Sequence, residues 1–163
     1  MPQESSNYLA LWDYGWCEHC TIKLPGQSTP NDIPNAYLLS HEFGTSFVFP
    51  EPGNNPNLHG PFLRSSIEAK HFKPFPIADL SQRLRSICLE SPDTKPVDLE
   101  QWQELELLAR SVIDRNNIAF ELSLTTADSE AHHEWGWVLL EFREFIFSNP
   151  GSSCIERLVI GYD

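Results

Sequence analysis

One segment of the sequence, Leu99–Arg115, constrains the fold most, because its helix signals are local and agree with one another. Asp98 is a good N-cap, and Gln101 three residues later completes a capping-box arrangement. The apolar positions of the segment recur at helical spacing: Leu99, Trp102, Leu105, Leu108, Ala109, Val112 and Ile113. A helix with one apolar stripe must bury that stripe against another layer. The sequence therefore predicts a surface helix over Leu99–Arg115 that packs on the rest of the domain.

The first third of the chain has a different character. Two stretches rich in Pro, Gly and Asn, at 25–35 and 50–61, punctuate it as loops. Only short segments remain between them, and these are rich in aromatic and branched residues, which favours strands. The predicted strands are Tyr8–Tyr14, Cys20–Leu24, Ala36–Ser40 and Thr45–Phe49.

Beyond residue 76 the spacing of apolar residues predicts longer elements. Helical spacing favours a helix over Ile77–Leu89, and strict alternation favours a strand over Ile118–Leu124. The apolar residues of Glu130–Ser148 fit one helix face, although Gly136 counts against a helix interior. We choose a helix there because the run is long for a strand. A closing strand over Ile155–Tyr162 completes the order.

The order of these elements indicates the fold class. Runs of strands followed by helices favour an α+β domain over a doubly wound sheet. We expect a single α+β domain over residues 1–163, with a small antiparallel sheet from the N-terminal third packed against two or three helices and a closing C-terminal strand. The last strand, helix and strand would suit a parallel crossover pair.

The net charge of the chain limits the kinds of partner that it is expected to bind. Acidic residues outnumber basic ones by 23 to 11, which gives a formal net charge of −12. Such a field repels phosphate backbones, so we expect no nucleic-acid partner, whereas a basic protein surface would be attracted. Solubility alone is the simpler reason for this acidity. No stretch approaches the roughly 20 apolar residues of a membrane span, and residues 1–10 lack the features of a signal peptide. We therefore expect a cytoplasmic protein.

The segment WCEHC at residues 16–20 carries the clearest chemical motif. Its C-x-x-C spacing brings Cys17 and Cys20 close enough in sequence to share a zinc ion or to form a disulfide. A zinc site would need further ligands, for which His132 or His133 is available. The segment also resembles locally the thioredoxin-type redox motif, but the prolines that follow cut off the long helix that this family needs. The simplest interpretation is that both are ordinary semi-buried cysteines.

Aromatic residues alternate just before and into this motif. Trp12, Tyr14 and Trp16 would share one face of a strand. An outward face would make them a candidate binding surface, since aromatic residues are enriched at interfaces. An inward face would make them part of the core, which is the more common role of such rings.

The sequence contains no G-x-S-x-G, Walker or G-x-G-x-x-G motif, which weakly favours a non-catalytic role. The leading hypothesis is a small acidic binding or regulatory protein without a cofactor, for instance one that masks a basic protein partner as an inhibitor or immunity protein does. The alternative is a zinc-binding or thiol-redox protein centred on Cys17 and Cys20. Nothing in the sequence indicates the oligomeric state.

Overall fold

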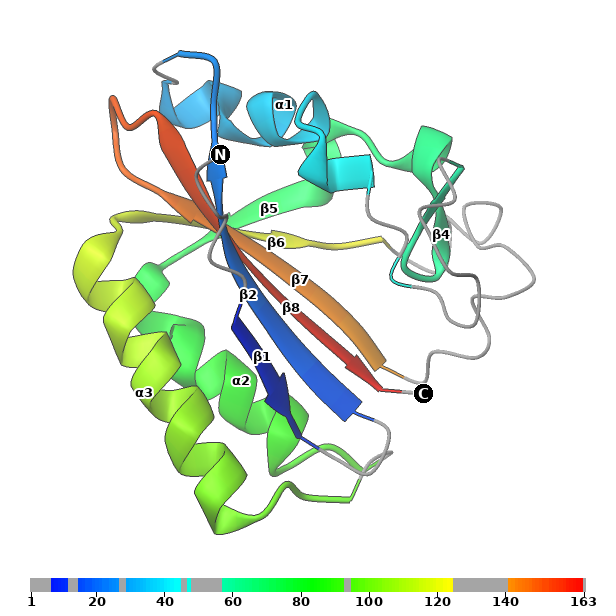
Figure 1. The fold of residues 1–163 in the computed structure, drawn as a ribbon, viewed down its shortest axis with the longest axis vertical. Coiled ribbons are helices and arrows are strands. Elements are labelled where there is room, and N and C mark those ends of the chain that lie inside the picture. Colours follow the sequence, from blue (N-terminus) through cyan, green and yellow to red (C-terminus); the bar gives the residue numbers. More distant parts are fainter. Residues whose placement is uncertain are drawn as a thin grey trace.

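The computed structural model describes residues 7–11, 15–26, 29–44, 47, 57–92, 95–124 and 141–162. These residues form an α+β fold in which an antiparallel sheet is covered on both faces (Figure 1). The helices are α1 (Ile33–Leu38), α2 (Leu80–Cys88) and α3 (Leu99–Arg115). The strands are β1 (Asn7–Ala10), β2 (Gly15–Lys23), β3 (Leu58–His59), β4 (Phe62–Leu63), β5 (Phe72–Phe75), β6 (Ile118–Leu122), β7 (Glu141–Ser148) and β8 (Cys154–Tyr162).

The main sheet has six strands in the order β1-β2-β8-β7-β6-β5, and every neighbouring pair is antiparallel. Its longest pairing joins β2 to β8 from Gly15↔Tyr162 to Lys23↔Cys154. Strand β8 therefore lies inside the sheet, between β2 and β7. The short β3–β4 hairpin forms a separate two-stranded sheet.

One face of the sheet, which we call the helix face, packs against α2 and α3 (Figure 1). Its core is apolar, and Leu84 of α2 and Leu105 of α3 meet Phe145 and Leu158 of the sheet there, all four fully buried. Helix α3 begins and ends as predicted, with Asp98 accepting from the backbone N–H of Gln101 in a capping box. The capping box and the apolar stripe predicted the bounds of this helix correctly because both depend on residues that are close in sequence.

The opposite face, which we call the hairpin face, is covered by α1, the β3–β4 hairpin and short 3₁₀ turns (Figure 1). Ile33 and Tyr37 of α1 are fully buried against this face, together with Ile146 and Ile155 of the sheet. Among the described residues, the elements that cover this face are all short.

Several predicted elements are confirmed. Strand β2 includes most of Cys20–Leu24, β1 includes residues 8–10 of Tyr8–Tyr14, and β6 and β8 match the predicted strands Ile118–Leu124 and Ile155–Tyr162 to within two residues. Helix α2 lies inside the predicted helix at 77–89 and follows a 3₁₀ turn at Ile77–Asp79. Apart from Phe47, the predicted strand at 45–49 lies outside the described residues.

Two predicted elements are wrong. Residues 36–38 of the predicted strand Ala36–Ser40 belong to α1, where Pro34 occupies the first turn, a position that a helix tolerates because that N–H has no helical partner. Residues 141–148 of the predicted helix Glu130–Ser148 form β7, whose last five residues are all buried. A strand covered on both faces loses its polar alternation and reads as a continuous apolar run. The parallel crossover pair is also wrong, because β8 is antiparallel to both of its neighbours.

Candidate functional site

The two cysteines of the C-x-x-C motif lie in β2, but on opposite faces of the sheet. Cys17 is fully buried in the core of the helix face, whereas Cys20 belongs to the core of the hairpin face. Burial raises the pKa of the Cys17 thiol well above its usual range, and nearby Cys88 raises it further. Residues three apart on a strand point in opposite directions. The strand therefore holds these thiols apart, and neither a shared metal ion nor a disulfide fits this arrangement.

The other residues of the zinc hypothesis, His132 and His133, lie outside the described residues. Within the part of the chain that the structure describes, no group of three or more His, Cys, Asp or Glu side chains is placed to hold a metal ion. None of the four cysteines is joined to another in a disulfide bond.

Of the aromatic residues Trp12, Tyr14 and Trp16, the first two lie outside the described residues. Trp16 is half-buried on the hairpin face, where its ring stacks on Phe47 with centroids 5.7 Å apart. A Cβ at Gly161 would lie 2.3 Å from the Trp16 ring, so the indole packs directly on the glycine backbone. Trp16 therefore contributes to packing within the molecule.

Four polar side chains from four elements meet beneath α1, and we call them the buried polar network: Tyr37, His59, Glu144 and Arg157. The Tyr37 hydroxyl donates to Oε1 of Glu144, and Nε2 of His59 donates to its Oε2 at 2.6 Å. A guanidinium N–H of Arg157 donates to the Tyr37 hydroxyl at 3.3 Å. Glu144 and His59 are completely buried.

The charges within the buried polar network balance one another. Burial alone would raise the pKa of Glu144, but the charges of His59 and Arg157 and the hydrogen bonds to it hold that pKa below its ordinary value. Burial, and then the negative charge of Glu144, raise the pKa of Tyr37 well above its usual range. Arg157 also donates to Glu18 at 3.0 Å. The buried charges are thus compensated by partners, as low-dielectric interiors require.

The network also fixes the chain segment at residues 42–44, a 3₁₀ turn. Nδ1 of His59 donates to the Phe43 carbonyl at 3.0 Å, and Arg157 donates to the Glu42 carbonyl at 2.7 Å. Its members are far apart in the sequence and show no motif spacing, so sequence reasoning missed them. The available signal was the position of Glu144 and Arg157, two charged residues that directly precede the apolar runs at 145–147 and 158–160.

A second ionic cluster ties the end of α3 to β8. Glu156 accepts from His19 at 2.8 Å, from two N–H groups of Arg115 at 3.0 and 2.8 Å, and from Asn116 at 3.0 Å. Burial opposes the negative charge of Glu156, but these donors outweigh it and hold its pKa well below the usual range. The C-terminal end of α3 is therefore anchored to the sheet.

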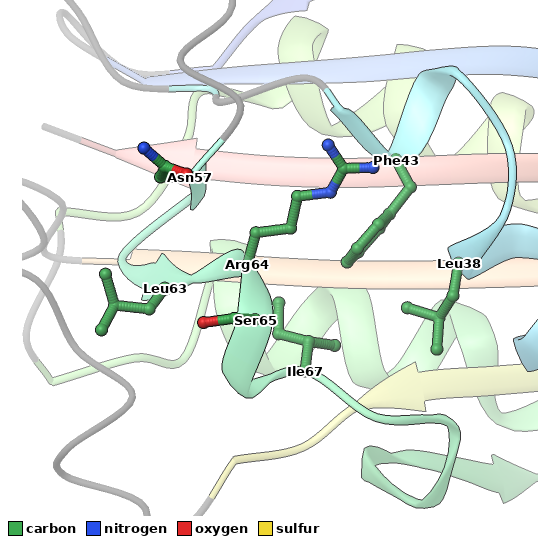
Figure 2. A pocket seen from close by; sticks show the side chains of 7 residues that line it. All are labelled: Leu38, Phe43, Asn57, Leu63, Arg64, Ser65 and Ile67. Atoms are coloured by element: carbon green, nitrogen blue, oxygen red, sulfur yellow. The ribbon is translucent and has the colours of Figure 1, made fainter.

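The hairpin face carries a pocket of about 660 Å³ beside the 42–44 turn (Figure 2). Its lining combines one charged, two polar and four apolar side chains: Arg64, Asn57, Ser65, Leu38, Phe43, Leu63 and Ile67. Figure 2 shows Arg64 between Asn57 and Leu63 on one side and Phe43 and Leu38 on the other. Phe43 joins the pocket to the buried polar network.

On the opposite side of the molecule, the outer face of α3 is acidic and carries an exposed leucine at its centre. Leu107 is 67% exposed. Helical spacing places Glu104 next to it, and Glu100 and Asp114 about two turns away on the same side of the helix. Arg110 lies on the same face and pairs with Glu106 at 3.4 Å. Leu99, at the first turn, is also 71% exposed. We call these residues the α3 outer face.

No helix of the described residues is long and apolar enough to cross a membrane. Comparisons of this chain with protein-family models, with curated proteins and with solved structures give no match.

Proposed function

We propose that this protein is a non-catalytic binding protein that engages a basic protein partner through the α3 outer face. The observation that carries the proposal is the exposed Leu107 on a helix face that also exposes Glu100, Glu104 and Asp114. An apolar contact surrounded by charge is the arrangement of a protein interface, where the centre is desolvated and the rim is polar. The chain's net charge of −12 favours a partner whose binding surface is basic.

The scaffold beneath this face supports the proposal because it is rigid. Asp98 and Gln101 cap the first turn of α3, and the Arg115–Glu156 bond fixes its last turn. The inner side of the helix is anchored by Trp102, Leu105 and Val112, all buried. A preorganised face loses little conformational entropy on association.

The state of the reactive side chains also favours binding over catalysis. Tyr37, His59 and Glu144 are fully buried and occupied by one another. Cys17 and Cys88 are buried thiols, and burial raises the pKa of Cys88 to about 12. A thiol must ionise to act as a nucleophile or metal ligand.

We propose further that the chain works as one domain in the cytoplasm and masks its partner in the manner of an inhibitor or immunity protein. Four cysteines with no disulfide bond between them are in keeping with a reducing compartment. Masking would need only a rigid complementary face and charge.

The test compares two variants that each lose two negative charges. Glu100→Gln/Glu104→Gln alters the α3 outer face, and the control Asp32→Asn/Glu68→Gln alters exposed acids elsewhere. Each protein is immobilised at low salt, proteins from the cell of origin are captured, and their isoelectric points are compared. We expect a basic protein that the wild type and the control retain, that the α3 variant loses, and that added salt releases.

A Leu107→Ala variant sharpens this test, because it leaves the charge unchanged and should weaken capture of the same protein. The proposal is overturned when no basic protein distinguishes the α3 variant from its control. It is equally overturned when Leu107→Ala binds the captured protein as well as the wild type does. Matching urea midpoints for all variants show that each one is folded.

A further inference from the structure

Another pocket, of about 610 Å³, lies between the end of β2 and the C-terminal end of α1. Figure 1 shows α1 at the end of the sheet where β2 finishes. The volume of this pocket lies within the range of small-molecule sites, which combine an apolar wall with a few polar groups that orient the ligand. Because α1 covers the hairpin face, what this pocket binds is independent of the α3 outer face.

Two side chains of opposite charge line the pocket without pairing. Lys23 is the exposed last residue of β2, and Glu42 begins the 3₁₀ turn at residues 42–44. Among the described residues, neither side chain forms an ion pair or a hydrogen bond, either with the other or with a third group. Arg157 holds the backbone carbonyl of Glu42 at 2.7 Å but leaves its carboxylate open. The pocket therefore offers one cation and one anion that are both available to a ligand.

An α-amino acid has the complementary pair of charges. Its carboxylate matches the ammonium of Lys23, and its own ammonium matches the carboxylate of Glu42. A simple carboxylic acid would meet the like charge of Glu42, and a simple amine would meet that of Lys23, so each is disfavoured. A zwitterion has no net charge, and the field of a chain with a net charge of −12 does not repel it. His41, also in the lining, adds a ring nitrogen that can donate or accept a hydrogen bond.

The apolar wall of the pocket comes from Leu24, Ala36 and Leu39. Leu39 is 89% exposed, more than any other large apolar side chain of the described residues. Covering such a surface with a ligand contributes about 0.8 kcal/mol for each CH₂ removed from water. A Cβ added at Gly26, which also lines the pocket, would meet nothing within 4 Å, so space remains on this side. The wall therefore favours a ligand with an apolar side chain.

Hydrogen bonds outside the pocket hold its walls in place. Oγ of Ser40 donates to the Tyr37 carbonyl at 2.7 Å and accepts from the Phe43 N–H at 3.3 Å, which fixes the turn after α1. The Leu24 N–H donates to the Ser153 carbonyl at 2.7 Å and fixes the chain after β2. A preformed pocket binds without ordering its own walls first.

The paired charges and the apolar wall together define one class of ligand. We propose that the pocket binds a free α-amino acid with an apolar side chain. The carboxylate of the ligand lies on Lys23 and its ammonium on Glu42. Its side chain packs against Leu24, Ala36 and Leu39.

The test uses four probes that separate the three parts of the ligand. Free leucine has all three parts, N-acetylleucine lacks the ammonium, leucinamide lacks the carboxylate, and glycine lacks the apolar side chain. Backbone amide shifts in NMR spectra of the full chain are titrated with each probe, up to about 10 mM. We expect saturable shifts at Leu24, Gly26 and Glu42, with leucine binding at least about tenfold more tightly than each of the other three probes.

Variants then assign the two charged contacts. Lys23→Gln should weaken leucine about tenfold or more without weakening leucinamide, which has no carboxylate and so shows that the pocket is intact. Glu42→Gln should likewise weaken leucine without weakening N-acetylleucine, which has no ammonium. The matched controls are Lys73→Gln, an exposed lysine of β5, and Glu104→Gln on the α3 outer face. Both should leave the affinity for leucine unchanged.

Three outcomes overturn the proposal. The first is a lack of saturable leucine shifts at the pocket residues. The second is N-acetylleucine or leucinamide binding there as tightly as leucine. The third is a leucine affinity in Lys23→Gln and Glu42→Gln that equals the affinity in their controls.

Discussion

The two faces of the central sheet are closed in different ways. The helix face is covered by α2 and α3, whose apolar stripes meet buried side chains such as Phe145 and Leu158. The hairpin face is covered by the short helix α1, a two-stranded hairpin and single turns. Within its apolar core this second face holds the buried polar network, in which Glu144 accepts from both Tyr37 and His59.

The difference shows how long and short covering elements are fixed in position. A long amphipathic helix is held by its continuous apolar stripe. A six-residue helix and a two-residue strand bury little area each, and directional hydrogen bonds specify where they sit. Both Arg157 and His59 donate to backbone carbonyls of the 42–44 turn, so the network positions chain as well as side chains.

The largest expected effect comes from breaking the network on the hairpin face. Glu144→Ala removes the buried carboxylate that accepts from Tyr37 and His59 and that balances the charge of Arg157, and we expect the free energy of unfolding to fall by about 3–5 kcal/mol. Urea denaturation at neutral pH measures this. The double variant Glu144→Leu/Arg157→Met removes both charges and should recover part of the loss. A double variant less stable than Glu144→Ala would contradict the role of charge pairing.

The matching change on the helix face is Leu105→Ala, in a fully buried residue of α3. The cavity and the lost burial should reduce the free energy of unfolding by about 3 kcal/mol, within the usual range for such truncations. Because no charge is involved, the loss should be the same at pH 5 and pH 8. Leu107→Ala on the exposed side of the same helix serves as the control and should change stability by less than about 0.5 kcal/mol.

A smaller effect tests how tightly the hairpin face is packed. Gly161→Ala would place a Cβ 2.3 Å from the Trp16 ring, so the indole must move, and we expect a loss of about 2 kcal/mol. Gly26→Ala is the control, since nothing lies within 4 Å of its added Cβ. Thermal unfolding of both variants makes the comparison. Equal stability of the two would show that the Trp16 ring adjusts without cost.

The smallest expected effect concerns Glu156, the central residue of the ionic cluster on the helix face. Its folded pKa lies below the ordinary value of 4.5, so its carboxylate stabilises the fold fully above pH 4.5, and this contribution is lost as the pH falls further. The wild type should exceed Glu156→Gln by about 1 kcal/mol at pH 7, after allowance for solvent screening, and by less at pH 3. Urea titrations at both pH values measure this difference. Glu100→Gln, on an exposed residue, is the control and should leave the free energy of unfolding at pH 7 unchanged.

The same contrast between faces explains which parts of the fold could be predicted from the sequence. Helix α3 was predicted to the residue because its cap and stripe are encoded locally. Strand β7 was missed because burial of both its faces removes alternation, and α1 was missed because Pro34 reads as a loop signal.

The candidate sites were harder to predict than the fold. The buried polar network joins Tyr37 to Glu144 and His59 to Glu144, and no local spacing links these residues. The C-x-x-C motif is local in sequence, yet whether its two thiols lie close together depends on the secondary-structure element that contains it. On a helix the two thiols would be neighbours, whereas on β2 they face different cores.

The position of β8 between β2 and β7 also affects the order in which the chain can fold. Strand β2 finds its main partner only when residues 154–162 are available, so the β1–β2 hairpin is synthesised long before that partner. Contacts between such distant segments make folding slow. Until β8 inserts, one edge of β2 offers unpaired backbone groups to any neighbouring chain, which is the usual route to intermolecular sheet formation. The nascent protein is therefore most vulnerable to aggregation just before β8 is added to the sheet.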